Sequence, residues 1–174
     1  MNPSEISLAH ATWALVAITF LLVLVTLGIA WRQSEAMRAD LKARFLLTFI
    51  DRFDGSRLRK ARKELGRRLL ANAARGQIEE TVIEFFEDMG LFLRRRYLDE
   101  ELIWSTFGFF AVRWWAACKG YVLEVRRVHD DSTLFTDFEH LAKRFLSRDA
   151  GAGLTEPTPS DLKQFLEDEQ DLQP

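Results

Sequence analysis

The amino-acid sequence predicts an all-α protein, in which a single N-terminal transmembrane helix continues into a helical stalk and is followed by a small cytosolic helical bundle. The stretch from Ala11 to Ala30 contains no charged residue. Further along, apolar residues recur every three or four positions, which is the spacing of amphipathic helices, and no run has the alternating pattern of a half-buried strand. Together these observations indicate helices throughout.

Residues 11–31 are predicted to cross a membrane, with Leu21 and Leu24 at the centre of the span. The stretch holds five Leu, two Ile, three Val and one Phe, and its length matches the hydrocarbon core of a bilayer. Trp13 and Trp31 lie about 27 Å apart along a helix, so both can reach the headgroups as an aromatic belt. A buried core helix is the alternative, but soluble helices this apolar on every face are rare.

Charges beside the span predict its orientation. Residues 1–10 contain no Lys or Arg, and positive charges follow the span at Arg32, Arg38, Lys42 and Arg44. The positive-inside rule then places residues 1–10 in the periplasm and the C-terminal domain in the cytosol of a bacterium, with the span in the inner membrane. A cleaved signal peptide is disfavoured, because it would need a basic start and a shorter apolar run.

Length and composition allow one cytosolic domain of ordinary size after the anchor. The formal net charge is −2, which gives no overall attraction to nucleic acid. Cys118 is the single cysteine, so an internal disulfide is excluded, in agreement with a reducing compartment.

Residues 32–54 are predicted to form the helical stalk, which ends at Gly55. An apolar stripe along it needs covering, either by the protein's own later helices or by a partner. The stripe consists of Met37, Leu41, Phe45, Thr48 and Phe49. Residues 55–148 form the bundle, with helices expected from Ser56 as N-cap to about Ala74, from Gln77 to about Arg96, from Asp99 as N-cap to about Val128, and from about Thr133 to Ser147.

The helix that begins at Ser56 is strongly basic, and it is the main functional signal in the sequence. Its side chains could contact anionic lipid, nucleic acid, or the acids of the helix that starts at Gln77. The nucleic-acid alternative is the weakest, because no aromatic residues interleave with the cations to stack bases. Contacts with lipid or an acidic partner are predicted for Arg57, Arg59, Lys60, Arg67 and Arg68.

The helix from Asp99 is unusually aromatic, and some aromatic residues lie away from its core stripe. Trp104, Phe109 and Trp115 are therefore predicted to contact a partner. Residues 149–174 are expected to form a flexible acidic tail, marked at its start by Gly151, Gly153, Pro157 and Pro159. Phe165 is a further predicted partner contact there, and the tail is either a short binding motif or a solubilising extension.

Residues for catalysis are not apparent. No glycine-rich phosphate loop is present. His129, Asp131 and His140 fall near one predicted turn, but no pair has the spacing that places two metal ligands on one helix face. Capping explains Asp99, Glu100 and Glu101. We therefore predict no enzyme activity, no catalytic residue, no metal and no cofactor.

Several short segments resemble a family of uncharacterised bacterial proteins, domain of unknown function family 4760. The resemblance rests on residues 83–90 (IEFFEDMG), 98–102 (LDEEL) and 107–110 (FGFF) with Trp114 and Trp115, and covers about residues 31–147. It implies a membrane helix followed by a small helical domain, and no agreed activity.

The function predicted from these features is that of a membrane-anchored, non-catalytic accessory subunit or adaptor of a membrane protein assembly. Its expected partners are the lipid bilayer and a protein in the membrane or at its cytosolic face, and the oligomeric state is left open. A lipid-responsive sensor that uses the basic helix is the alternative. An uncharacterised enzyme or a nucleic-acid-binding effector is a second alternative.

Overall fold

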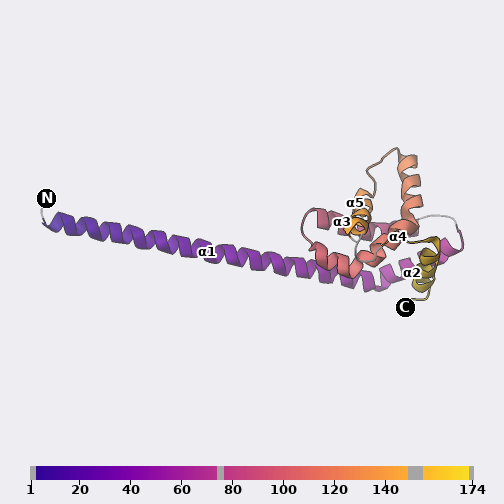
Figure 1. The fold of residues 1–174 in the computed structure, drawn as a ribbon, viewed down its shortest axis with the longest axis horizontal. Coiled ribbons are helices and arrows are strands. Elements are labelled where there is room, and N and C mark those ends of the chain that lie inside the picture. The colour runs from indigo at the N-terminus through magenta and orange to yellow at the C-terminus, as the bar shows by residue number, and fades with distance from the viewer. Residues whose placement is uncertain (1–2, 74–76, 149–154, 173–174) are drawn as a thin grey trace. The chain divides into compact units, whose positions relative to one another are not determined.

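The computed structural model describes residues 3–73, 77–148 and 155–172. Within these ranges the chain forms helices and no strand (Figure 1). The helices are α1 (Pro3–Asp54), α2 (Ser56–Leu70), α3 (Gln77–Arg94), α4 (Glu100–His129), α5 (Thr136–Arg148) and α6 (Pro159–Gln170). The all-α class is confirmed.

Two units make up the chain, Met1–Leu41 and Lys42–Pro174, called unit 1 and unit 2 below. In the described chain, α1 is the one helix that is long and apolar enough to cross a membrane. Trp13, Leu21, Leu24 and Trp31 are all at least half exposed on it. The hydroxyl of Thr26 donates to the carbonyl of Leu22 at 2.7 Å, so this polar group is satisfied inside the helix, as a lipid environment requires.

Unit 2 begins within the predicted stalk, because residues 42–54 of α1 belong to the helical bundle. Phe49 and Phe53 are buried, and Phe45 is half-buried against Phe92 with ring centroids 5.2 Å apart. Phe45 and Phe49 of the apolar stripe are thus covered by the protein's own helices, whereas Thr48 is exposed. Met37 and Leu41, which lie in unit 1, remain exposed.

The centre of unit 2 is α3, whose residues Val82, Phe85 and Met89 are fully buried at the predicted helical spacing. It crosses α5 at Gly90, where an added Cβ would lie 2.3 Å from the carbonyl oxygen of Asp137. Only a glycine allows this approach of two backbones. Next to the crossing, the Glu87 carboxylate accepts the backbone N–H groups of Asp137 at 3.2 Å and Phe138 at 2.6 Å. Glu87 therefore caps the start of α5 from another helix.

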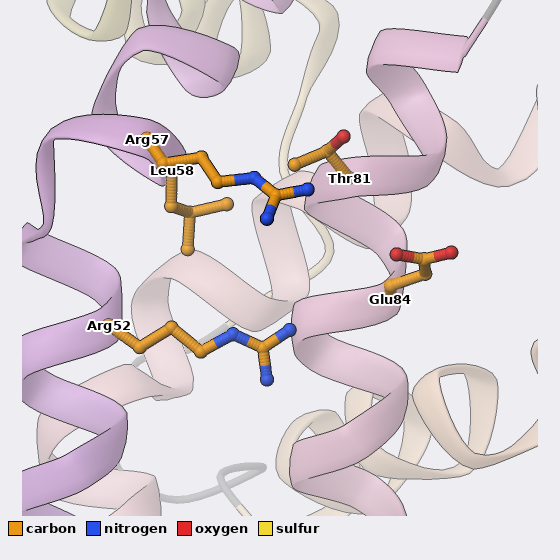
Figure 2. A pocket seen from close by; sticks show the side chains of 5 residues that line it. All are labelled: Arg52, Arg57, Leu58, Thr81 and Glu84. Atoms are coloured by element: carbon orange, nitrogen blue, oxygen red, sulfur yellow. The ribbon is translucent and has the colours of Figure 1, made fainter.

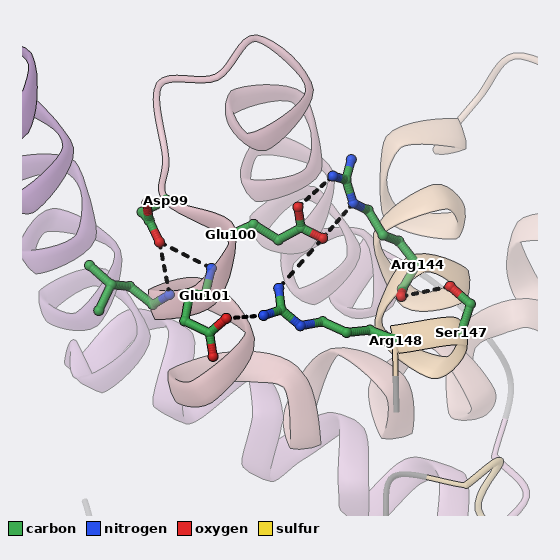
Figure 3. Close-up of polar contacts among 7 residues, drawn as sticks. Asp99, Glu100, Glu101, Arg144, Ser147 and Arg148 are labelled. Atoms are coloured by element: carbon green, nitrogen blue, oxygen red, sulfur yellow. Dashed lines mark hydrogen bonds and ion pairs between the residues drawn. The ribbon is translucent and has the colours of Figure 1, made fainter. Parts of the chain in front are cut away.

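The start of α4 is joined to the end of α5 by acidic and basic side chains (Figure 3). Asp99 is the N-cap of α4, as predicted, and accepts the backbone N–H groups of Glu101 and Leu102. Arg144 pairs with Glu100 at an Nε–Oε1 distance of 2.6 Å, and Arg148 pairs with Glu101. These acids therefore pair with α5 in addition to their favourable place in the first turn of α4.

Several predicted helix boundaries are corrected by the structure. The N-cap of α2 is Gly55, and the predicted cap Ser56 is its first helical residue. This helix ends at Leu70 and not near Ala74, because Asn72 turns the backbone to a positive φ of 48°. The start of α5 is three residues later than expected, at Thr136, since Asp131 accepts the N–H of Thr133 in a local turn at 2.8 Å.

The predicted flexible tail is corrected over the range of α6. This helix has a capping box, in which Thr158 and Asp161 each accept a backbone N–H of the other. Phe165, Leu166 and Glu169 are buried, so α6 packs on the other helices of unit 2 through an apolar face that contains one carboxyl group. Gly151 and Gly153 lie outside the described residues, and Pro159 is the first residue of the helix.

Candidate binding site on the basic helix

One face of α2 is buried, and it contains an arginine among its apolar residues. Leu58, Ala61 and Leu65 are buried at helical spacing, and Arg62 is also only 3 % exposed. Its position follows from spacing, because residue 62 lies four positions after Leu58 and three before Leu65 on a helix. Arg62 is not among the contact residues predicted from the sequence, because its charge favours an exposed position.

Arg62 lies between aromatic rings and a carboxylate from α6. Its guanidinium is 3.6 Å from the centroid of the Phe53 ring, which is a cation–π contact. It faces Glu169, which is 3 % exposed, with Nε and Oε2 separated by 3.5 Å. Burial lowers the pKa of Arg62, and burial raises the pKa of Glu169 to about 7 in spite of the nearby arginine.

The pair is poorly hydrogen-bonded for two charged groups. Charge-assisted N–H···O bonds are usually about 2.7–2.9 Å long, whereas the Nη1–Oε1 distance between Arg62 and Glu169 is also 3.5 Å. Within the described residues, Arg62 Nε and Glu169 Oε2 have no hydrogen-bond partner. The contact between α2 and α6 therefore contains polar groups that a better-placed ligand could satisfy.

Backbone packing brings α6 close to α2 at Gly66. A Cβ at this position would lie 2.9 Å from the carbonyl oxygen of Leu166. Beside it, the ring of Phe165 lies 5.2 Å from Trp114 and 6.0 Å from Phe109. At the end of α6, Lys63 donates to the carbonyl of Leu172 at 3.0 Å. The fit combines a close backbone approach, an aromatic pocket and a cation.

The five predicted contact residues of α2 differ in their surroundings. Arg57, Lys60 and Arg67 are exposed, and Arg59 and Arg68 are half-buried. Arg67 and Arg68 both bind Glu64 of the same helix, at 2.7 and 2.9 Å, and these hydrogen bonds hold the pKa of Glu64 at about 2. In the described part of the chain, Arg62 of α2 therefore pairs with Glu169 of α6, and Arg67 and Arg68 pair with Glu64 of their own helix.

A polar cavity of about 220 Å³ lies where α1 ends, between α2 and α3 (Figure 2). Arg52 and Arg57 extend into it from α1 and α2, toward Thr81 and Glu84 of α3. Arg52 also pairs with Asp88 at 2.6 Å. Because carboxylates neutralise part of its charge, the cavity offers a mixed polar surface and not a dedicated anion site.

Of the four predicted partner contacts, one is corrected. Phe165 is buried against Phe109, Phe110 and Trp114 of the protein's own α4, where the apolar pocket removes it from water. Trp104 and Trp115 are half-buried. Phe109 remains 47 % exposed, with the guanidinium of Arg113 stacked 3.6 Å above its ring.

The histidines considered as catalytic or metal-binding groups do not gather at a buried site. His129 and His140 are exposed. Glu139 pairs with Arg126 at 2.7 Å and with Lys143 at 2.6 Å. Among the described residues, no group of three or more His, Cys, Asp or Glu side chains is arranged to hold a metal ion.

These features define a class of protein in which a small helical domain is joined to one apolar helix long enough to cross a membrane. The chain belongs to the family described as domain of unknown function (DUF4760), whose model matches residues 6–145. The match includes the apolar helix and ends before α6. Comparisons with curated proteins and with solved structures found no match.

Proposed function

We propose that the protein is a membrane-anchored, non-catalytic accessory subunit or adaptor. Residues 11–31 would hold it in the inner membrane of a bacterium, with the N-terminus outside and unit 2 in the cytosol. The uncharged apolar stretch and the cations that follow it support this topology. The role is then to bring a protein partner to the bilayer.

The observation that carries the proposal is apolar surface on α4 that the folded domain leaves exposed. Leu102, Phe109, Leu123 and Val128 are 45, 47, 58 and 64 % exposed. The first three are separated by multiples of seven residues, which places them on one side of a helix. Because the opposite side of α4 already fills the core with Ile103 and Trp114, this helix has a second apolar face that fits a partner.

Site-specific photocrosslinking in cells tests this surface. A photoreactive residue at Leu123 or Phe109 is expected to give a discrete adduct with one protein, whereas the same residue at the exposed loop position Ser132 is the matched control. Adducts of equal yield at all three positions, or none at Leu123 and Phe109, would contradict the proposal. A chain that purifies from mild detergent as a lone monomer would also count against it.

Lipid sensing is the second candidate function. One observation favours it at the residues that follow α3, and not on α2, where the sequence predicted the lipid contacts. Arg95, Arg96 and the 55 % exposed Tyr97 follow α3, at the end of unit 2 where Lys42 pairs with Asp99 at 4.0 Å. Since α1 enters unit 2 at Lys42, this is the end joined to the apolar stretch. By contrast, α2 begins after the last residue of α1, about 18 Å further along that helix.

Hydrogen exchange in nanodiscs separates these two basic segments. Anionic phosphatidylglycerol is expected to protect residues 94–98 relative to neutral phosphatidylcholine, and reversal of Arg95 and Arg96 to Glu removes the protection. Reversal of Arg57 and Arg67 should leave it unchanged. Exchange that does not depend on the lipid charge would remove this candidate.

A further inference from the structure

The surface that α6 covers is a groove formed by α2 and α4, and we call it the α6 groove. Arg62, Gly66, Phe110 and Trp114 line it, and Phe53 of α1 lies behind Arg62. We propose that the α6 groove is the binding site for an acidic amphipathic helix of a partner protein, and that α6 is a tethered competitor that occupies the site in the isolated chain. This proposal rests on the proposed adaptor function and specifies the chemistry of its partner.

The bound α6 shows which features the groove recognises. Phe165 fills the aromatic pocket beside Trp114, and Leu166 is buried next to it. Glu169, four residues after Phe165 and therefore on the same helix face, meets Arg62 at the floor of the groove. A Phe-Leu-x-x-Glu sequence on a helix reproduces this pattern.

Charge supports the same type of occupant. Lys63 of α2 is exposed beside the groove and contacts the segment after α6, and Arg62 lies inside the groove. The end of α6 carries Glu167, Asp168 and Asp171, and Lys63 caps its C-terminal side through the carbonyl of Leu172 at 3.0 Å. An acidic helix is attracted to this surface, whereas a basic helix is repelled.

Three observations indicate that α6 can be replaced. It has 12 residues, a length at which an isolated helix is marginal in water. It lies outside the family match, whereas every residue that lines the groove lies inside it. Its one buried ion pair is long, with atoms left without a hydrogen bond in the described chain. A partner helix whose carboxylate comes closer to Arg62 therefore competes effectively.

The test uses the full-length chain in detergent and a fluorescent peptide with the sequence of residues 155–172. Phe165→Asp in the chain places a charge in the aromatic pocket and releases α6, but leaves every groove residue unchanged. The peptide is expected to bind this variant about tenfold or more tightly than wild type, because in wild type the groove is free only a small fraction of the time. Circular dichroism verifies that the variant remains folded.

Matched peptides define the specificity. A generic acidic helix that retains only Phe, Leu and Glu at the positions of residues 165, 166 and 169 should bind within about tenfold of the natural sequence, and the same peptide with a basic exposed face should bind poorly. In the Phe165→Asp background, Gly66→Ala should weaken binding about tenfold, since the backbone approach is blocked.

Three results would overturn the proposal. One is equal, weak binding of the peptide to wild type and to a folded Phe165→Asp chain. Another is binding of the natural peptide alone, which would dedicate the groove to the protein's own tail. The third is crosslinking between position 63 of one copy and position 172 of another in wild type, which would assign the groove to a second copy. The photocrosslinks at Leu123 do not involve the groove, so the adaptor proposal succeeds or fails separately.

Discussion

Gly66→Ala is expected to loosen α6 without unfolding the rest of unit 2. The added Cβ would lie 2.9 Å from the carbonyl oxygen of Leu166, and ordinary contacts of a Cβ begin at 3.4 Å. Both atoms belong to helix backbones or are fixed to one, so rotation of a side chain cannot relieve the contact. The helix α6 must move away by a few tenths of an ångström.

The size of the effect follows from two opposing contributions. Overpacking of a well-packed contact costs about 1–3 kcal/mol, which corresponds to a roughly 5- to 150-fold loss in docking of α6. Alanine inside a helix also stabilises that helix by about 1 kcal/mol relative to glycine. This second contribution strengthens α2 whether α6 is docked or not, so it does not restore docking.

Hydrogen exchange of the full-length protein in detergent measures both contributions at once. Amides of α6 should lose protection by about 5- to 150-fold, while amides of α2 keep or gain protection and those of α3 are unchanged. Gly90→Ala is the matched control, because its Cβ would lie 2.3 Å from the carbonyl oxygen of Asp137 in the core of the bundle. This control should lower protection across α3 and α5 together.

Two results would refute the reasoning about Gly66. Unchanged protection of α6 would mean that the helices separate slightly without loss of contact. Equal loss of protection in all helices of unit 2 would mean that α6 and the bundle unfold as one unit, and that α6 is not a replaceable element.

Three further predictions concern pH, a remote cap and the apolar helix. Burial raises the pKa of Glu169 from 4.5 to about 7, so docked α6 favours the protonated carboxyl group. Binding of the 155–172 peptide to the Phe165→Asp chain should therefore weaken about tenfold or more as the pH rises from 4.5 to about 7, and stay constant above that. A peptide with Glu169→Gln should show no such change. Glu87→Ala leaves the first N–H groups of α5 without their acceptor, and a decrease of about 1–3 kcal/mol in the free energy of unfolding is expected from denaturant titration; a change confined to α6 would contradict this role. Leu24→Arg places a charge at the centre of the proposed span, which raises the free energy of membrane insertion by about 2.5–3.5 kcal/mol. Less protein should therefore remain in carbonate-washed membranes, whereas Met37→Arg should have little effect.

Local sequence signals predicted the helices of the bundle well. The spacing of Val82, Phe85 and Met89 places them on one face, and all three are buried. Asp99 followed by two acids predicted the start of α4, where the Asp99 side chain accepts two backbone N–H groups. These features depend on neighbours within one or two helical turns, and this is the range over which a sequence pattern determines local structure.

Features that depend on distant residues could not be predicted in the same way. The start of α5 is fixed by Glu87, fifty residues before Asp137, and nothing near Thr136 reveals it. Likewise, α6 has an acidic composition typical of a solvated tail, and its burial depends on the backbone approach at Gly66. Arg62 could have been found, because its position falls on the apolar stripe of α2, but its charge argued for the surface.

Phe53 lies at the junction between the core and the α6 groove, and this makes it useful as a spectroscopic reporter. One side of its ring contacts Phe85 and Phe107 at 5.4 and 5.3 Å, and Arg62 lies above the ring at 3.6 Å. Any occupant that draws the guanidinium toward its own carboxylate changes the electric field at the ring. A fluorine label on Phe53 would therefore distinguish an empty groove, a groove filled by α6 and a groove filled by a partner. The label does this without direct contact with α6 or with the partner helix.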